Sequence, residues 1–233
     1  MSSQSQMTLP VELNDDARFE NFYVSAKNKQ LLLSLKNSIT PNSNNFIYLW
    51  GGDSSGKSHL LQALCHQAEV IGKTSLYLSC KDLQSISPEV LEGAQSLSLV
   101  CIDDAELISG LVNWEQALFT LFNQLKESDT AFVLASNASA TDLTIGLADL
   151  KSRIQSMLVY NLFRLDDEDK KKALQLRAAQ RGFQLPDLVA DFILARAGRG
   201  FSELMSVLDT LDSTSLVEQR KLTVPLVKTT LGW

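Results

Sequence analysis

Short apolar runs alternate with amphipathic stretches over the first two thirds of the chain. Five runs have the length and composition of buried strands, at residues 46–50, 75–78, 97–102, 131–135 and 157–160. Between them, residues 58–71 and 114–127 repeat apolar positions at spacings of three and four, as amphipathic helices do. This alternation predicts an α/β fold of three layers, with a five-stranded parallel sheet and crossover helices.

The pattern changes after residue 161, where strand-like runs stop. Four helical stretches follow, at residues 166–181, 186–197, 201–217 and 223–231. Asp166 is a suitable N-cap for the first of them, Gly182 a suitable stop, and Pro186 stands at the next helix start. We therefore expect a flexible tail of residues 1–14, an α/β domain of residues 15–164 and a small all-α domain of residues 165–233.

Composition and charge narrow the classes of function. The net charge is −6, so the chain lacks the basic surface that tight binding to a nucleic-acid backbone needs, and we expect no direct sequence-specific DNA binding. No apolar run approaches the roughly 18 residues of a membrane span, and the first ten residues do not resemble a secretory signal. A cytoplasmic protein without membrane contact is the expectation.

Cysteine and histidine positions argue against a metal cluster. Cys65, Cys80 and Cys101 each lie in an apolar segment, which predicts buried free thiols. His59 and His66 are seven residues apart, with no further cysteine or histidine at the spacing of a zinc site.

Residues 51–58 (GGDSSGKS) fit the pattern G-x-x-x-x-G-K-[ST] between a predicted strand and a predicted helix. Glycines let several backbone N–H groups face one anion, and the start of the helix adds its positive end. Lys57 then reaches the terminal phosphates, and Ser58 offers its hydroxyl to Mg²⁺. An ordinary glycine-rich turn is the alternative. The eight matched positions and both flanks favour a site for a nucleoside di- or triphosphate with Mg²⁺.

Two carboxylates follow the third predicted strand. Asp103 is expected to hold magnesium through its water shell, and Asp104 to orient the attacking water. A pair of acids that caps the next helix is the alternative.

Asn137 and Arg153 are further candidates. Asn137 follows the fourth predicted strand, where this type of fold keeps a polar residue that senses the γ-phosphate; a plain turn residue is the alternative. Arg153 lies in a short helical stretch before the fifth strand. Its order after Asn137 favours an arginine finger that acts in trans over a merely solvated side chain.

Several segments resemble the bacterial DnaA family of AAA+ proteins, and the resemblance covers nearly the whole chain. Residues 19–24 (FENFYV), followed by Asn28 and Gln30, resemble the segment that leads into its ATPase domain. Residues 51–61 and 149–154 resemble its phosphate loop and arginine-finger box. The resemblance implies a P-loop AAA+ domain that binds ADP or ATP and is followed by a helical lid. The residues expected to bind the nucleotide are Tyr23, Val24, Gly52, Ser54, Ser55, Gly56, Lys57, Ser58, His59 and Arg199.

Two features are more similar to the Hda proteins, the DnaA-related group of regulatory inactivation. DnaA continues past its lid into a helix-turn-helix domain, which is not expected here. Residues 6–10 (QMTLP) resemble the short motif that docks on the bacterial β sliding clamp, with Gln6, Met7, Leu9 and Pro10 as the contact residues. Residues 170–182 and 220–228 also resemble Hda. The resemblance implies that this protein joins the clamp and supplies Arg153 to promote hydrolysis of DnaA-bound ATP.

Two positions depart from the family pattern. Asp104 is one methylene shorter than the glutamate of most AAA+ motors, which predicts weak intrinsic hydrolysis. The lid arginine that acts as a second sensor should stand beside Glu203, but Ser202 does, so Arg199 is the nearest basic candidate. A stand-alone ATPase or helicase-loader-like factor remains the alternative function, followed by a nucleotide-stabilised structural partner, and a homo-oligomer is left open.

Overall fold

Five parallel strands form one sheet, in the order β2-β3-β4-β1-β5. They are β1 (Phe46–Trp50), β2 (Ser75–Ser79), β3 (Leu99–Asp103), β4 (Ala131–Ser136) and β5 (Leu158–Asn161). The computed structural model of the chain describes residues 13–40, 45–198, 200–218 and 222–233. Each predicted apolar run forms a strand, and the carboxyl ends of β1, β3 and β4 meet at one edge, where ligands of parallel sheets bind.

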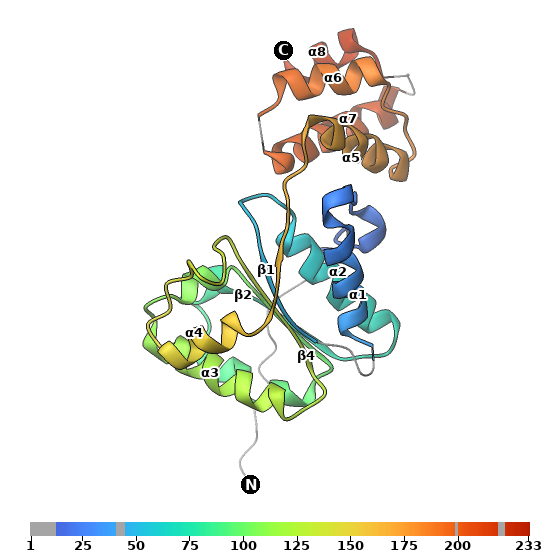
Figure 1. Cartoon of the computed structure of the whole chain (residues 1–233). Coiled ribbons are helices and arrows are strands. Elements are labelled where there is room, and N and C mark those ends of the chain that lie inside the picture. Colours follow the sequence, from blue (N-terminus) through green and yellow to red (C-terminus); the bar gives the residue numbers. More distant parts are fainter. Residues whose placement is uncertain (1–12, 41–44, 199, 219–221) are drawn as a thin grey trace.

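Helices cover both faces of the sheet (Figure 1). On one face lie α1 (Lys29–Ser38) and α2 (Lys57–Val70), whose leucines pack on Ile47 and Val133. On the other face lie α3 (Val112–Lys126) and α4 (Ala148–Gln155). This is the three-layer α/β arrangement that the sequence predicts, although α1 was not among the predicted helices.

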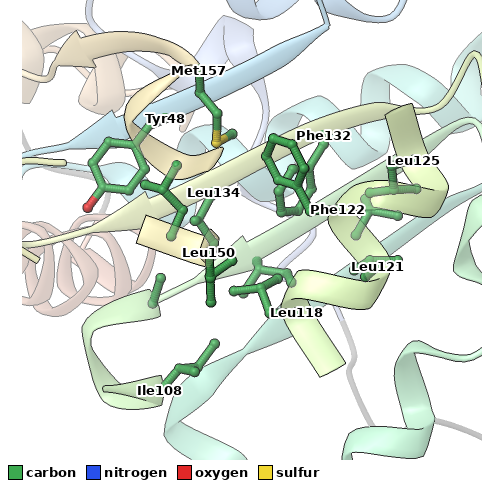
Figure 2. Packing of buried hydrophobic residues seen from close by; sticks show 14 of the residues in the cluster. Tyr48, Ile108, Leu118, Leu121, Phe122, Leu125, Phe132, Leu134, Leu150 and Met157 are labelled. Atoms are coloured by element: carbon green, nitrogen blue, oxygen red, sulfur yellow. The ribbon is translucent and has the colours of Figure 1, made fainter. Parts of the chain in front are cut away.

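The core beneath α3 is built on aromatic side chains (Figure 2). Phe122 contacts Phe46 edge-on, with ring centroids 5.0 Å apart. The ring of Phe132 lies at right angles to that of Phe122, with centroids 6.1 Å apart. Phe122 and Phe132 are fully buried, and each contributes roughly 1.5–3 kcal/mol by leaving water. Tyr48 is also fully buried, and its hydroxyl donates to the carbonyl of Ala138 at 2.8 Å.

Four helices follow the sheet and form a separate cluster, drawn apart from the sheet in Figure 1. They are α5 (Asp167–Gln180), α6 (Asp187–Arg196), α7 (Phe201–Glu218) and α8 (Val224–Leu231). The Asp166 side chain caps α5 by accepting from the N–H of Asp169 at 2.9 Å, and Gly182 ends it with a φ of 86°. Leu174, Ile193 and Leu208 form the buried centre of this helical lid.

Two further expectations can be compared with the described residues. Cys65, Cys80 and Cys101 are buried and free, as predicted. Within the described part of the chain, no helix has the length and apolarity to span a membrane.

Candidate nucleotide-binding site

The loop between β1 and α2 has the backbone shape of an anion site. Gly56 has a φ of 102° and Ser54 a φ of 56°, so the chain turns sharply before α2 begins. No side chain caps α2 at Gly56, which leaves backbone N–H groups at the helix start for another acceptor. A Cβ at Gly56 would lie 2.8 Å from Cε2 of Phe22, so glycine is required there by both φ and space.

Two buried donors in this loop fit a phosphate chain. Lys57 is only 7% exposed, and its Nζ donates to the carbonyls of Gly51 at 2.8 Å and Gly52 at 3.3 Å. The Oγ of Ser55 is buried, and no hydrogen-bond partner is found for it among the described residues. A buried hydroxyl without a partner costs about 1–3 kcal/mol, which an anion in the loop would relieve. The residues present therefore fit a nucleotide's phosphates.

Asp103 lies fully buried at the end of β3, beside this loop. Its carboxylate accepts from the hydroxyl of Tyr77 at 3.0 Å and from the backbone N–H of Asp104 at 3.0 Å. Burial raises the pKa of Asp103, while hydrogen bonds, the largest of them from Ser58, offset part of that increase. Among the described residues no group of three or more acidic, cysteine or histidine side chains could hold a metal. Ser58 with Asp103 instead suits Mg²⁺, which phosphates and water also coordinate.

Asp104 contacts residues at the end of β2. Its backbone is left-handed, with a φ of 55°, which is uncommon for a residue with a side chain. Its carboxylate pairs with Nζ of Lys81 at 3.1 Å and accepts from the hydroxyl of Ser79 at 3.4 Å. The sequence analysis did not identify Lys81 as a partner, because the pairing joins residues 23 positions apart, one just after β2 and the other just after β3.

Asn137 lies at the end of β4, directly beside the start of the phosphate loop. Ser136, one residue earlier, accepts the N–H of Gly51 at 3.2 Å through its carbonyl. The N–H of Asn137 and the hydroxyl of Ser136 both donate to one carboxylate oxygen of Glu106, at 3.1 and 2.9 Å. Glu106 thus fixes this turn, and the Asn137 side chain is exposed. Sequence analysis missed Glu106, although it lies only three residues after Asp103.

A cavity of about 540 Å³ opens between the loop and the lid. Of the residues expected to bind the nucleotide, five line it: Tyr23, Ser54, Ser55, Gly56 and His59. Val24, Gly52, Lys57 and Ser58 do not line it, and Arg199 lies outside the described residues. The lining residues that the sequence analysis missed are Asn21, Phe22, Asp53, Arg164, Leu165, Lys170, Ala173, Arg177, Gly200, Phe201 and Met205.

The leading segment, residues 13–28, ties the loop to the lid. The ring of His59 contacts that of Phe22, and its Nε2 lies 2.8 Å from the carbonyl of Arg18. Burial lowers the pKa of His59. The hydroxyl of Tyr23 donates to Asp169 of α5 at 3.0 Å, so the wall near the predicted base site reaches the lid.

Arg153 lies elsewhere. It is exposed on α4 and does not line the cavity, and its side chain forms no ion pair with another described residue. The loop before α4 is held by Glu115 of α3, which is 4% exposed and accepts from the N–H groups of Gly110, Gly146 and Leu147 at 2.9, 3.0 and 2.8 Å. Gln6, Met7, Leu9 and Pro10 lie outside the described residues.

Comparison with known families gives two matches that together cover most of the chain. The bacterial DnaA ATPase domain matches residues 13–161, and the lid domain of Hda matches residues 167–231. The first match covers the sheet and its helices, and the second covers the four helices of the lid.

Solved structures share the architecture. Domain III of the replication initiation protein DnaA from Thermotoga maritima has a TM-score of 0.79 at 22% identity, over 95% of this chain and 98% of that one. AMPPCP-bound DnaA from Aquifex aeolicus has 0.75 at 24%, over 87% and 67%. The Thermotoga maritima RuvB Holliday junction branch migration motor has 0.70 at 15%, over 93% and 71%. These similarities establish the AAA+ fold.

Proposed function

Because the chain belongs to the family of bacterial DnaA ATPase domains and carries an Hda-type lid, we propose that it is a nucleotide-bound regulator of replication initiation. In this proposal it acts on DnaA: it docks on the β sliding clamp and promotes hydrolysis of the ATP that DnaA holds. Its own nucleotide, ADP or ATP, stabilises the form that meets the partner.

The nucleotide is held by the loop and its neighbours. Backbone N–H groups at the start of α2 and the ammonium of Lys57 bind the phosphates, and the hydroxyl of Ser55 gains its acceptor. Ser58 and Asp103 hold Mg²⁺, which when bound neutralises charge on the outer phosphates. Tyr23 and His59 lie in the cavity wall on the side of the base and ribose.

Weak hydrolysis by the protein itself follows from the position of Asp104. A carboxylate that orients water must face the phosphates, whereas Asp104 is bound to Lys81 and Ser79. The chain therefore has the parts of a nucleotide-binding site, but the acid proposed to orient water is engaged by Lys81 and Ser79.

Arg153 is the observation that carries the regulatory role. Its guanidinium is exposed on α4 and lies outside the protein's own cavity, so it is available to a nucleotide on another molecule. The three hydrogen bonds of Glu115 hold the loop from which α4 starts, so the side chain is presented by a fixed helix. An arginine supplied in trans to a transferring phosphoryl group is worth roughly 10³ to 10⁵ in rate.

The tail would supply the second contact. Residues 6–10 precede the described part of the chain, and the proposal for them rests on the sequence QMTLP alone. An extended peptide can place Met7 and Leu9 in an apolar groove while the amide of Gln6 forms hydrogen bonds. Docking there would raise the local concentration of Arg153 near DnaA on clamp-loaded DNA.

The test measures ATP turnover by purified DnaA with clamp-loaded DNA. The added proteins are wild type, Arg153→Ala and a variant without residues 1–12, with Lys151→Ala as a control that removes a positive charge from the same helix. We expect stimulation by wild type and by the control, and its loss in the other two variants with unchanged nucleotide binding. If no stimulation occurs, the regulatory role is wrong and a stand-alone ATPase or helicase-loader-like factor takes its place. If all four proteins stimulate equally, the roles of Arg153 and of the tail are wrong.

A further inference from the structure

The guanidinium of Arg164 lies directly over the phosphate loop. A Cβ added to Gly52 would come within 2.7 Å of its Nε and 2.8 Å of its Cζ. Arg164 also lines the cavity, although it belongs to the linker between β5 and α5 rather than to the loop or the lid. A long charged side chain thus occupies the space into which a side chain at position 52 would point.

Hydrogen bonds fix the linker at Leu162 and Phe163, the two residues before Arg164. The N–H of Leu162 donates to the carbonyl of Trp50 at 2.7 Å, which continues the pairing of β5 with β1 by one residue. The side-chain amide of Asn28, 1% exposed, donates to the carbonyl of Phe163 at 2.9 Å and accepts its N–H at 3.0 Å. The backbone therefore enters position 164 at a set place and direction.

Arg164 differs from two other cationic residues that line the cavity in its ion pairing. Lys170 pairs with Asp167 at 3.2 Å, and Arg177 pairs with Asp16 at 3.2 Å. For Arg164 no ion pair is found within the described residues. Its guanidinium lies against Gly52, and Asp53, which also lines the cavity, forms no ion pair with it, so the cavity contains a cation that is not paired with an anion of the described residues.

The position of Lys57 indicates which part of a bound nucleotide would lie near Arg164. Its ammonium contacts the carbonyl of Gly52, and the lysine of such loops binds the outer phosphates. Arg164 lies across the same glycine. A guanidinium binds phosphate oxygens through two parallel N–H donors, which a lysine cannot reproduce.

We propose that Arg164 is a phosphate-binding residue for the outer phosphates of the nucleotide, supplied by the linker. The inference rests on the proposed nucleotide site. Because Arg164 immediately precedes the lid, a phosphate bound to it also fixes the start of α5 relative to the loop.

The experiment measures dissociation constants for ADP and ATP by calorimetry, and competition by inorganic tripolyphosphate. The variants are Arg164→Ala and Arg164→Lys. Arg196→Ala is the matched control, because Arg196 is an arginine of the lid that stacks on Phe192 and does not line the cavity. Thermal unfolding without nucleotide checks that each variant folds.

We expect Arg164→Ala to bind ADP, ATP and tripolyphosphate about tenfold or more weakly, Arg164→Lys to fall between it and wild type, and Arg196→Ala to equal wild type. Unchanged affinities in Arg164→Ala, with loss of binding in Lys57→Ala, would overturn the role of Arg164 and leave the nucleotide site intact. A weaker affinity that arises only with a lower unfolding temperature, in both Arg164 variants alike, would also overturn it. Failure of wild type to bind any nucleotide would refute the proposed site itself.

Discussion

Removing the carboxylate of Glu115 should detach the start of α4 and lower both stability and regulatory activity. One carboxylate oxygen accepts from Gly110 and Gly146, and the other accepts from Leu147. Hydrogen bonds to a charged group contribute about 1.5–3 kcal/mol each. Gly110 and Gly146 are exposed, so water replaces part of that loss in a variant.

We expect Glu115→Ala to lower the free energy of unfolding by about 3 kcal/mol, and Glu115→Gln by about 1–2 kcal/mol, because an amide keeps one accepting oxygen and loses the other. For a chain of this length, 3 kcal/mol corresponds to roughly 6–12 °C in unfolding temperature. Thermal and urea unfolding measure the effect. Glu127→Gln is the control, since Glu127 is exposed at the other end of the same helix.

The effect should depend on pH. Burial raises the pKa of Glu115, but its three backbone N–H donors outweigh burial and bring the pKa below its ordinary value of 4.5. The ionised carboxylate therefore stabilises the fold fully above about pH 4.5, and this contribution is lost as the pH falls through the folded-state pKa. The difference between wild type and Glu115→Gln should be constant from pH 5 to 8 and decrease below pH 4.5.

The same variants report on Arg153, because α4 carries it. Stimulation of DnaA by Glu115→Ala should fall toward that of Arg153→Ala at a temperature where the variant is still folded. A Glu115→Ala protein within 0.5 kcal/mol of wild type, or a difference that does not change between pH 7 and pH 4, would refute the reasoning about this carboxylate.

Three other changes give distinct results. Lys81→Ala should raise the intrinsic ATP turnover several-fold, because it frees Asp104 to face the cavity; an unchanged or lower single-turnover rate would contradict this. Asn28→Ala should cost about 2–3 kcal/mol in urea unfolding, since it leaves both polar backbone groups of Phe163 without their partner; a loss below 0.5 kcal/mol would show that water replaces the amide. Gly56→Ala should abolish binding of fluorescent ADP, because alanine is strained at a φ of 102° and its Cβ would clash with the ring of Phe22. Micromolar binding by that variant would count against the loop geometry.

The elements with strong local signals could be predicted from sequence. Each of the five apolar runs forms a strand. Asp166 begins α5 as its N-cap and Gly182 ends it with a positive φ, and both roles follow from the type of the single residue. The strand bounds differ from the predicted ones by at most two residues. β3 begins at Leu99 rather than at residue 97, because the N–H of Leu97 closes a turn on Ala94.

The site could be predicted only in part. The phosphate loop has a continuous motif, whereas the partners that complete the cavity come from distant segments. Asn28 and Phe163 are 135 residues apart, and the interaction of Arg164 with Gly52 depends on how β5 lies beside β1. No periodicity or spacing along the chain records such contacts. Lys81 and Glu115 were missed for the same reason, since each carries out its role through a partner on another element.

The contacts of the leading segment also determine the order in which the molecule can be completed during synthesis. Tyr23 reaches Asp169 across 146 residues, Asp16 reaches Arg177 across 161, and Glu20 reaches Gln180 across 160. Such contacts form only after the chain between them has left the ribosome and closed a long loop. The sheet has all five strands by residue 161, while the cavity still lacks α5. The cavity is therefore completed late, only once the leading segment and α5 have docked against each other.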